Sequence, residues 1–290
     1  MMSLRRHMSL LALLFALAPA AFAQRDTTLN IATYNLRMNT ERDGLNAWPH
    51  RRELVKSLVR YHDFDVFATQ EALPDQVADM AGMAEYAHVG RGRDDGRSAG
   101  EHSAIFYKRQ RFELLRAGDF WLSQTPERPS LGWDATCCHR IVSWAQLLDL
   151  RTGRKFFFFS VHFDHEGQVA QRESAKLVLR KVREIAGAET VIVAGDFNSG
   201  PETEQIGTMK SQLADAFDVS AKPRYGPAGT FNGFKIDSPL DERIDYIFVS
   251  PKVKVLSYAA LTDSRHGRFP SDHLPVVIKA WIDVQSPATK

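Results

Sequence analysis

The stretch Val191-Ile192-Val193-Ala194-Gly195-Asp196-Phe197-Asn198 places a carboxylate and a carboxamide directly after a short apolar run. A run of this length that is rich in β-branched residues is typical of a buried strand. Asp196 and Asn198 therefore lie where the strand ends, and Gly200-Pro201 turns the chain away from it. A plain Asx turn gives the same local pattern. Whether Asp196 and Asn198 form a turn or part of a functional site therefore depends on the rest of the sequence.

Five other apolar stretches also begin or end at a polar side chain. Three of them run into Asn35, Glu71 and His162, and two follow directly after Asp245 and after Asp272-His273. In a mixed sheet the end of one strand and the start of its antiparallel neighbour share a rim, and α/β proteins usually place sites at strand ends. Each polar group alone has a plain explanation, such as a cap, a core histidine or a structural ion pair. Six coincidences together favour one shared site.

Helices and strands alternate along the chain, and no repeat, linker or long charge block divides it. The continuous apolar run Phe156–Phe159 indicates a strand that is buried on both faces. Helices are expected from about Pro49, near 75–83 and over Gly167–Ala186. Strands are expected at 30–36, 65–69, 86–90, 103–108, 112–116, 141–150, 155–163, 190–194, 244–249 and 274–282. Many buried strands with helices around them predict a layered α/β fold, and we expect residues 24–290 to form one domain.

The residue types at the strand ends also indicate the chemistry. Asn, Asp and Glu offer hard oxygen ligands, which favour Mg²⁺ or Mn²⁺, and these ions leave positions free for water and a substrate phosphate. Hydrolysis of a phosphoester then needs a group that orients the attacking water, a role that suits Asp196. The phosphoryl oxygens could be bound by Asn198, His162 and His273. Asp245, placed behind His273, would fix the tautomer of the His273 imidazole and raise its basicity.

Six motifs in this order carry a resemblance to a known family: ATYNL, ATQEA, SVHFDH, AGDFNSGP, RIDYIFVS and SDHLPV, spread over Leu29–Ile282. The sequence resembles the endonuclease/exonuclease/phosphatase superfamily, the deoxyribonuclease-I-like metal-dependent hydrolases. The resemblance implies a four-layer sandwich of two mixed β-sheets flanked by helices, an α/β (α+β) fold. It also implies that Glu71 is the principal metal ligand, with Asn35 beside it and Asp272 near the metal.

The stretch FWLSQTPERPSLGWDATCCHRIVSW resembles a branch of largely uncharacterised, often bacterial, exported members. His162 stands where the abasic-site repair branch has tyrosine, so that branch is disfavoured. Within this stretch Arg140 is a candidate phosphate anchor, with a structural ion pair as the alternative. Trp133 is a candidate pocket residue, with a place in the core as the alternative, and His165, which flanks His162, is a third candidate for substrate binding.

The first 23 residues have the features of a secretory signal peptide. Arg5 and Arg6 precede an apolar run from Leu10 to Ala18, and Ala21-Phe22-Ala23 forms a typical cleavage site. The run is shorter than the roughly 20 residues that a spanning helix needs, although a short membrane anchor is the alternative. We expect cleavage after Ala23 and a periplasmic or secreted protein without stable membrane insertion.

Without Arg5 and Arg6, the 37 Lys and Arg residues become 35 and equal the 35 Asp and Glu residues. Broad nonspecific binding to nucleic acid depends on basic residues that neutralise phosphates. The zero net charge of the mature chain therefore argues against a broad nucleic-acid-binding face, although a chain without net charge can still carry a local basic patch.

The chain has two cysteines, Cys137 and Cys138, which are adjacent in sequence. Neighbouring Cα atoms lie about 3.8 Å apart, whereas ordinary disulfides join Cα atoms at roughly 4.4 Å or more. We therefore expect semi-buried thiols, with a vicinal disulfide and a soft-metal site as the alternatives.

The leading hypothesis is an exported Mg²⁺- or Mn²⁺-dependent phosphoesterase, a monomer that acts on a small or lipid-linked phosphodiester or phosphomonoester. A secreted nuclease acting on DNA or RNA is the first alternative, and the neutral charge weighs against it. A binding module that kept the fold without turnover is the second alternative. The presence of every expected carboxylate and imidazole weighs against this last hypothesis.

Overall fold

Twelve strands form two six-stranded mixed sheets within residues 27–283, the part of the chain that the computed structural model describes. The first sheet has the order β11-β12-β1-β2-β4-β3, with β1 at Leu29–Asn35, β2 at Val66–Gln70, β3 at Tyr86–Val89, β4 at Ile105–Lys108, β11 at Val253–Ala260 and β12 at Val276–Ile282. The second has the order β5-β6-β7-β8-β10-β9, with β5 at Phe112–Trp121, β6 at Ile141–Asp149, β7 at Arg154–His162, β8 at Val191–Asp196, β9 at Ala214–Asp215 and β10 at Asp245–Val249. The expected signal peptide, residues 1–23, lies outside the described residues.

The two sheets pack face to face because alternate side chains of their strands are apolar. Ile31 and Ile278 of the first sheet join Phe158 and Ile192 of the second in one buried cluster. Phe157 and its alternate neighbours on β7 point the other way, into a second cluster beneath helix α3. The prediction that Phe156–Phe159 is buried on both faces is therefore confirmed.

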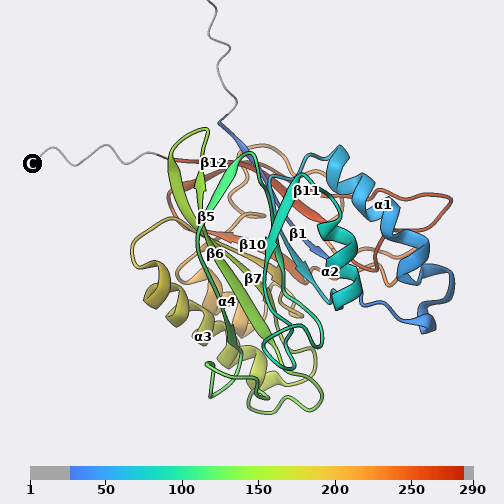
Figure 1. Ribbon diagram of the computed structural model, residues 1–290, viewed down its shortest axis with the longest axis horizontal. Helices are drawn as coiled ribbons and strands as arrows, with labels where there is room; N and C mark the ends of the chain where they lie inside the picture. The colour runs from blue at the N-terminus through green and yellow to red at the C-terminus, as the bar shows by residue number, and fades with distance from the viewer. Residues whose placement is uncertain (1–26, 284–290) are drawn as a thin grey trace, which may run out of the picture.

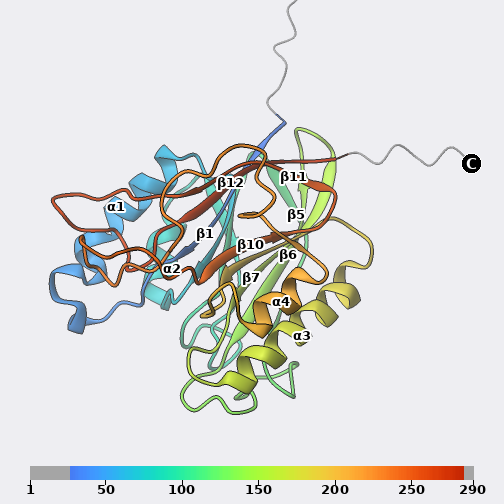
Figure 2. The ribbon, with the colours of Figure 1, turned by 180° about the vertical axis from the view of Figure 1, so that it is seen from behind.

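Helices cover the outer face of each sheet and complete four layers. The first sheet is covered by helices α1 (Trp48–Tyr61) and α2 (Pro74–Ala81), with the 3₁₀ helix η1 (Glu41–Asn46) just before α1. The second sheet is covered by helices α3 (Gln168–Ala186) and α4 (Glu204–Lys210). Figure 1 shows α1 and α2 on one side of the sheets and α3 and α4 on the other, and the view from behind agrees (Figure 2). The predicted four-layer sandwich is confirmed. None of these helices is both long and apolar enough to cross a bilayer.

The strand register explains why the polar strand ends meet. In parallel pairs, Asn35 lies opposite Gln70 and His162 lies opposite Asp196. In the antiparallel pair of β8 and β10, Asp245 at the start of one strand lies opposite Asp196 at the end of the other. The ends of β1, β2, β7 and β8 and the starts of β10 and β12 therefore share one rim of the sandwich.

Besides η1, α4 and β9, which were not predicted, two strands differ from the sequence prediction. Strand β11 was not predicted, and it pairs with β12 at an edge with a register shift between Val255 and Ser257. Such a bulge interrupts the alternation of apolar and polar residues by which strands are recognised. Strand β5 also continues to Trp121, beyond the expected end at residue 116, with a second shift between Leu114 and Arg116.

Candidate active site

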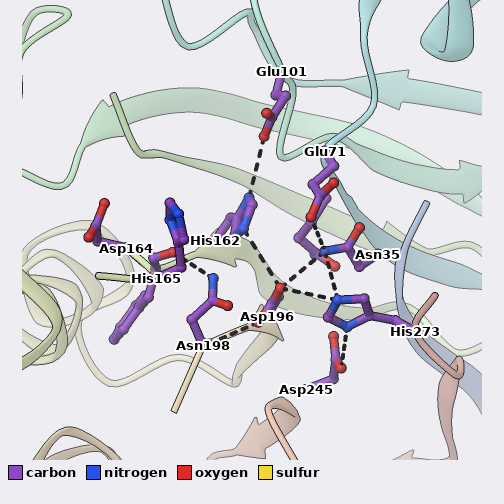
Figure 3. Close-up of polar contacts among 12 residues, drawn as sticks. Asn35, Glu71, Glu101, His162, Asp164, His165, Asp196, Asn198, Asp245 and His273 are labelled. Atoms are coloured by element: carbon purple, nitrogen blue, oxygen red, sulfur yellow. Dashed lines mark hydrogen bonds and ion pairs between the residues drawn. The ribbon is translucent and has the colours of Figure 1, made fainter. Parts of the chain in front are cut away.

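Asp196 lies at the centre of the polar cluster on this rim (Figure 3). Its Oδ2 accepts a hydrogen bond from Asn35 Nδ2 at 3.0 Å and lies 3.7 Å from His162 Nε2 and 3.9 Å from His273 Nε2. Its Oδ1 accepts from the backbone N–H of Asn198 at 2.8 Å. The structure thus brings together residues from four strand ends around one buried carboxylate.

Glu71 forms one side of the cluster. Its Oε1 accepts from Asn35 Nδ2 at 2.9 Å, and its Oε2 accepts from the Met38 N–H at 3.1 Å. Burial alone would raise the pKa of Glu71, but the charge of His273 and these two hydrogen bonds lower it below the usual range. Glu71 is therefore ionised at neutral pH. Its φ of 63° is unusual for a residue that is not glycine, as is common where function fixes the backbone.

His273 and Asp245 form the expected pair. Asp245 Oδ2 lies 2.8 Å from His273 Nδ1. Burial opposes a charged imidazole, but Asp245 and Asp196 raise the pKa of His273 well above its usual value. His273 therefore presents a protonated Nε2 to the interior of the pocket.

The donor set fits a divalent cation. Within residues 27–283, ligand atoms of Glu71, Asp196 and His273 all lie within 4.8 Å of one another, and the carboxylates of Glu71 and Asp196 are the members that can bind a cation while His273 is protonated. Burial and the neighbouring charge of Asp245 raise the pKa of Asp196 to about 7, so a nearby cation would favour its ionised form. Carboxylate oxygens are the ligands that Mg²⁺ and Mn²⁺ prefer.

Asp272 lines the same pocket but faces a different neighbour. Its carboxylate lies 3.8 Å from Arg37 Nε and accepts from Ser271 Oγ at 3.3 Å. Burial raises the pKa of Asp272, against the positive charge of His273. Asp272 thus stands next to the group that can hold the cation, on the side of Arg37.

The other side of Asp196 carries His162 and Arg140. Arg140 Nη1 lies 3.0 Å from His162 Nε2, its Nη2 lies 2.7 Å from His165 Nδ1, and its Nε lies 3.5 Å from Asp164. Burial and the charge of Arg140 lower the pKa of His162 well below its usual value, so that this imidazole is neutral. Arg140 is buried and borders the pocket, so it combines the structural ion pair with a place at the site.

Glu101 and Arg93 also belong to the site, although the sequence analysis missed them. Glu101 Oε2 lies 3.7 Å from His162 Nδ1 and accepts from Arg93 Nη1 at 2.5 Å. Both residues come from the polar, glycine-rich segment between β3 and β4, not from the end of an apolar strand. The only signal in the sequence is that Glu101-His102-Ser103 leads into a buried strand.

The pocket above these residues has a volume of about 500 Å³. It is lined by Arg37, Met38, Glu71, Arg93, Glu101, Cys137, Cys138, Arg140, His162, His165, Asp196, Asn198, Phe231, Glu242, Ile244, Asp272 and His273. Trp133 is not among them, because its side chain packs against the apolar cluster beneath α3. Its proposed place in the pocket is therefore corrected to a place at the edge of the core.

Cys137 and Cys138 form a disulfide with each other. The expectation of semi-buried thiols is wrong, and the structure has the alternative, a vicinal disulfide. The irregular segment before β6 holds the side chains of these neighbours close enough to bond, although their Cα atoms lie only 3.7 Å apart. Cys137 is exposed and Cys138 is half-buried, and both border the pocket.

Comparison with known proteins agrees with this geometry. The Endonuclease/Exonuclease/phosphatase family matches residues 32–273, which include every polar residue of the cluster from Asn35 to His273. The chain belongs to this family. It is accordingly a hydrolase of phosphoester bonds, and members of the family typically depend on a divalent metal.

Three relatives of this endonuclease/exonuclease/phosphatase family protein are informative. The structure of a mannosyl-6-phosphatase from Bacteroides thetaiotaomicron is 41% identical, with a TM-score of 0.82 over 87% of this chain and 99% of that one. A second family protein from the same organism is 41% identical, with a TM-score of 0.85 over 89% of this chain and 99% of that one. Human tyrosyl-DNA phosphodiesterase 2 is 24% identical over 89% of this chain and 70% of its own length.

Proposed function

We propose that this protein is an exported, Mg²⁺- or Mn²⁺-dependent phosphoesterase that hydrolyses small phosphomonoesters such as sugar phosphates. The observation that carries the proposal is the position of Asp196. Asp196 belongs with Glu71 to the group that can hold a cation, and its Oδ2 also lies within 4 Å of two imidazoles, the neutral ring of His162 and the protonated ring of His273. This is the arrangement that hydrolysis of a phosphoester needs.

Each side chain then has one role. Asp196 orients the attacking water and accepts its proton. Protonated His273, held by Asp245, and the amide of Asn198 stabilise charge on the phosphoryl oxygens. His162 is neutral and occupies the opposite side of the phosphoryl position. A cation bound at Glu71, with Asn35 and Asp272 beside it, would neutralise the carboxylates and polarise the phosphoryl group.

The size and charge of the pocket support a small anionic substrate. A volume of about 500 Å³ is within the range of pockets that bind small molecules. Five carboxylates line it as well, so Arg37, Arg93 and Arg140 would suit an anion together with a bound cation that offsets part of this negative charge. The mannosyl-6-phosphatase relative at 41% identity supports a sugar phosphate more strongly than the phosphodiesterase relative at 24% supports a nucleic acid end.

Export and the monomeric state belong to the same proposal. The signal peptide expected at residues 1–23 supports release into the periplasm or medium. Mass spectrometry of the protein recovered outside the cytoplasm should give a chain that begins at Gln24, and size exclusion should give the mass of a single chain. A protein that keeps Met1 and stays with the membrane would contradict export.

The activity is tested with the mature protein on a panel of substrates, each with EDTA and after addition of Mg²⁺ or Mn²⁺. The panel contains mannose 6-phosphate, glycerol 3-phosphate, bis(p-nitrophenyl) phosphate, plasmid DNA and RNA. We expect metal-dependent release of phosphate from the monoesters, abolished in Asp196→Asn. Nicking of plasmid as the preferred reaction would replace the proposal with a secreted nuclease, and no turnover on the whole panel would favour a binding module.

A further inference from the structure

The Cys137–Cys138 disulfide borders the active-site pocket, although catalysis of phosphoester hydrolysis has no use for it. Arg140 follows Cys138 by two residues and contacts both His162 and His165. The disulfide therefore stands at the His162 side of the pocket. Figure 3 shows His162 and His165 on the opposite side of Asp196 from Glu71 and His273.

The segment that carries the disulfide is anchored on both sides of it. Before the disulfide, Asp134 accepts from the N–H groups of Val169 and Ala170 at the start of α3, and Thr136 Oγ1 donates to Glu166 at 2.6 Å. After it, the Arg140 carbonyl accepts from the Leu122 N–H at 2.8 Å. The two sulfurs are thus held at a fixed place on the pocket wall.

The chemistry of this wall differs from that of most of the pocket. Of the 17 lining residues, most carry a charge or an imidazole, and the cystine is an uncharged surface of polarisable sulfur. A phosphoryl group at Asp196 is already surrounded by the cation-binding side and by His162 and Asn198. Arg140, His165 and the two cysteines line the pocket beyond His162, so the remainder of a compact substrate has room to extend past His162 toward the disulfide.

We propose that the Cys137–Cys138 disulfide determines substrate selectivity by providing the wall against which the C–H face of a sugar ring packs. The inference rests on the proposed function and adds a cause for preference among phosphomonoesters. Substrates with a ring gain contact with the sulfurs, whereas an open-chain phosphate of three carbons does not. Breaking the S–S bond frees the two side chains to separate and removes the wall.

The test compares oxidised and reduced protein on two substrates. Reduction with tris(2-carboxyethyl)phosphine adds two electrons and two protons to the S–S bond and gives two thiols, while the phosphine takes oxygen from water and becomes the phosphine oxide. The reagent acts at one bond only, since the whole chain contains two cysteines. The readout is the ratio of kcat/KM for mannose 6-phosphate to kcat/KM for glycerol 3-phosphate.

We expect this ratio to fall about fivefold on reduction, mainly through a higher KM for the sugar phosphate, as for the loss of one apolar contact to a substrate. Reoxidation should restore it. The double variant Cys137→Ser/Cys138→Ser should show the low ratio, and phosphine treatment should not change that variant further. A circular dichroism spectrum equal to that of the wild type serves as the folding control.

A ratio that is the same in the oxidised, reduced and double-variant proteins would overturn the inference while leaving the phosphatase proposal intact. A fall of kcat/KM in the same proportion for both substrates would also overturn the inference, because such a fall would indicate that the disulfide only stabilises the structure of the pocket. If the oxidised protein hydrolyses neither monoester, the proposed function fails, and the inference fails with it.

Discussion

Glu71 and Asp196 are buried in the same cluster but have opposite electrostatic surroundings. Hydrogen bonds and the charge of His273 keep the pKa of Glu71 low, whereas burial and Asp245 raise that of Asp196 to about 7. Glu71 is therefore the carboxylate that is already ionised when a cation arrives. We expect Glu71→Gln to weaken Mn²⁺ binding by about tenfold or more, and Asp196→Asn to lower kcat by at least about 100-fold with a smaller loss of Mn²⁺ affinity. Titration calorimetry and steady-state kinetics measure both, and equal losses of affinity would contradict this division of roles.

His162 gives a prediction for stability against pH in the metal-free protein. Its pKa is well below 6.5 in the folded state because burial and Arg140 disfavour the charged ring. Below pH 6.5 the unfolded chain therefore binds a proton at this position that the folded protein does not. The free energy of unfolding of the wild type should fall relative to that of His162→Gln as pH falls from 6.5, with a slope of about 1.4 kcal/mol per pH unit. Urea denaturation at several pH values measures the difference, and a constant offset would mean that His162 has an ordinary pKa.

The predicted site residues that the structure brings together share a position at the end or start of an apolar strand, as Asp196 and Asp245 do. The sheet register then brings them together without any further information. Glu101 and Arg93 lie in an irregular segment, where the backbone path decides what a side chain meets. The disulfide was only an alternative for the same reason, because the separation of two neighbouring Cα atoms says nothing about how a loop turns their side chains.

At the scale of elements, the site depends on the close approach of β7 and β8. Gly195 lies opposite Val161, and a Cβ at Gly195 would stand 2.0 Å from the Val161 carbonyl oxygen. Gly195→Ala should therefore push β8 away from β7, lower the free energy of unfolding by about 2 kcal/mol or more and reduce kcat by displacing Asp196. At Gly200 a Cβ would meet no atom within 4 Å, so the matched control Gly200→Ala should change stability by less than about 0.5 kcal/mol. Chemical denaturation of both variants checks this, and equal effects would show that the contact with Val161 is unimportant.

Elements with a regular pattern were predictable. The hairpin of β6 and β7 and the helix that ends before Gly187 lie within two residues of their expected bounds, since alternation, periodicity and a glycine stop all agree. Strands with a bulge were not predictable, because the alternation of apolar and polar residues in β11 and in the far half of β5 is interrupted at the register shift.

At the scale of the whole molecule, the proposed cation site would join the two sheets. Glu71 follows β2 in the first sheet, and Asp196 ends β8 in the second. A cation bound there would stabilise the two sheets together. At a concentration 100 times its Kd, it would raise the free energy of unfolding by about 2.7 kcal/mol. We expect Mn²⁺ to raise the thermal transitions seen by tryptophan fluorescence and by circular dichroism by the same amount, with a much smaller effect in Glu71→Gln. Two transitions of which one moves would contradict the prediction that residues 24–290 form one domain.

If side chains from both sheets hold one divalent cation beside Asp196, anomalous diffraction from crystals of the mature protein grown with Mn²⁺ will locate that cation. We predict an anomalous peak within about 2.2 Å of a Glu71 carboxylate oxygen, next to Asn35 and Asp272 and inside the pocket. The peak should be weaker in Glu71→Gln at a Mn²⁺ concentration that only just saturates the wild type. A pocket without a peak at saturating Mn²⁺, or a peak that persists unchanged in the variant, would contradict the account.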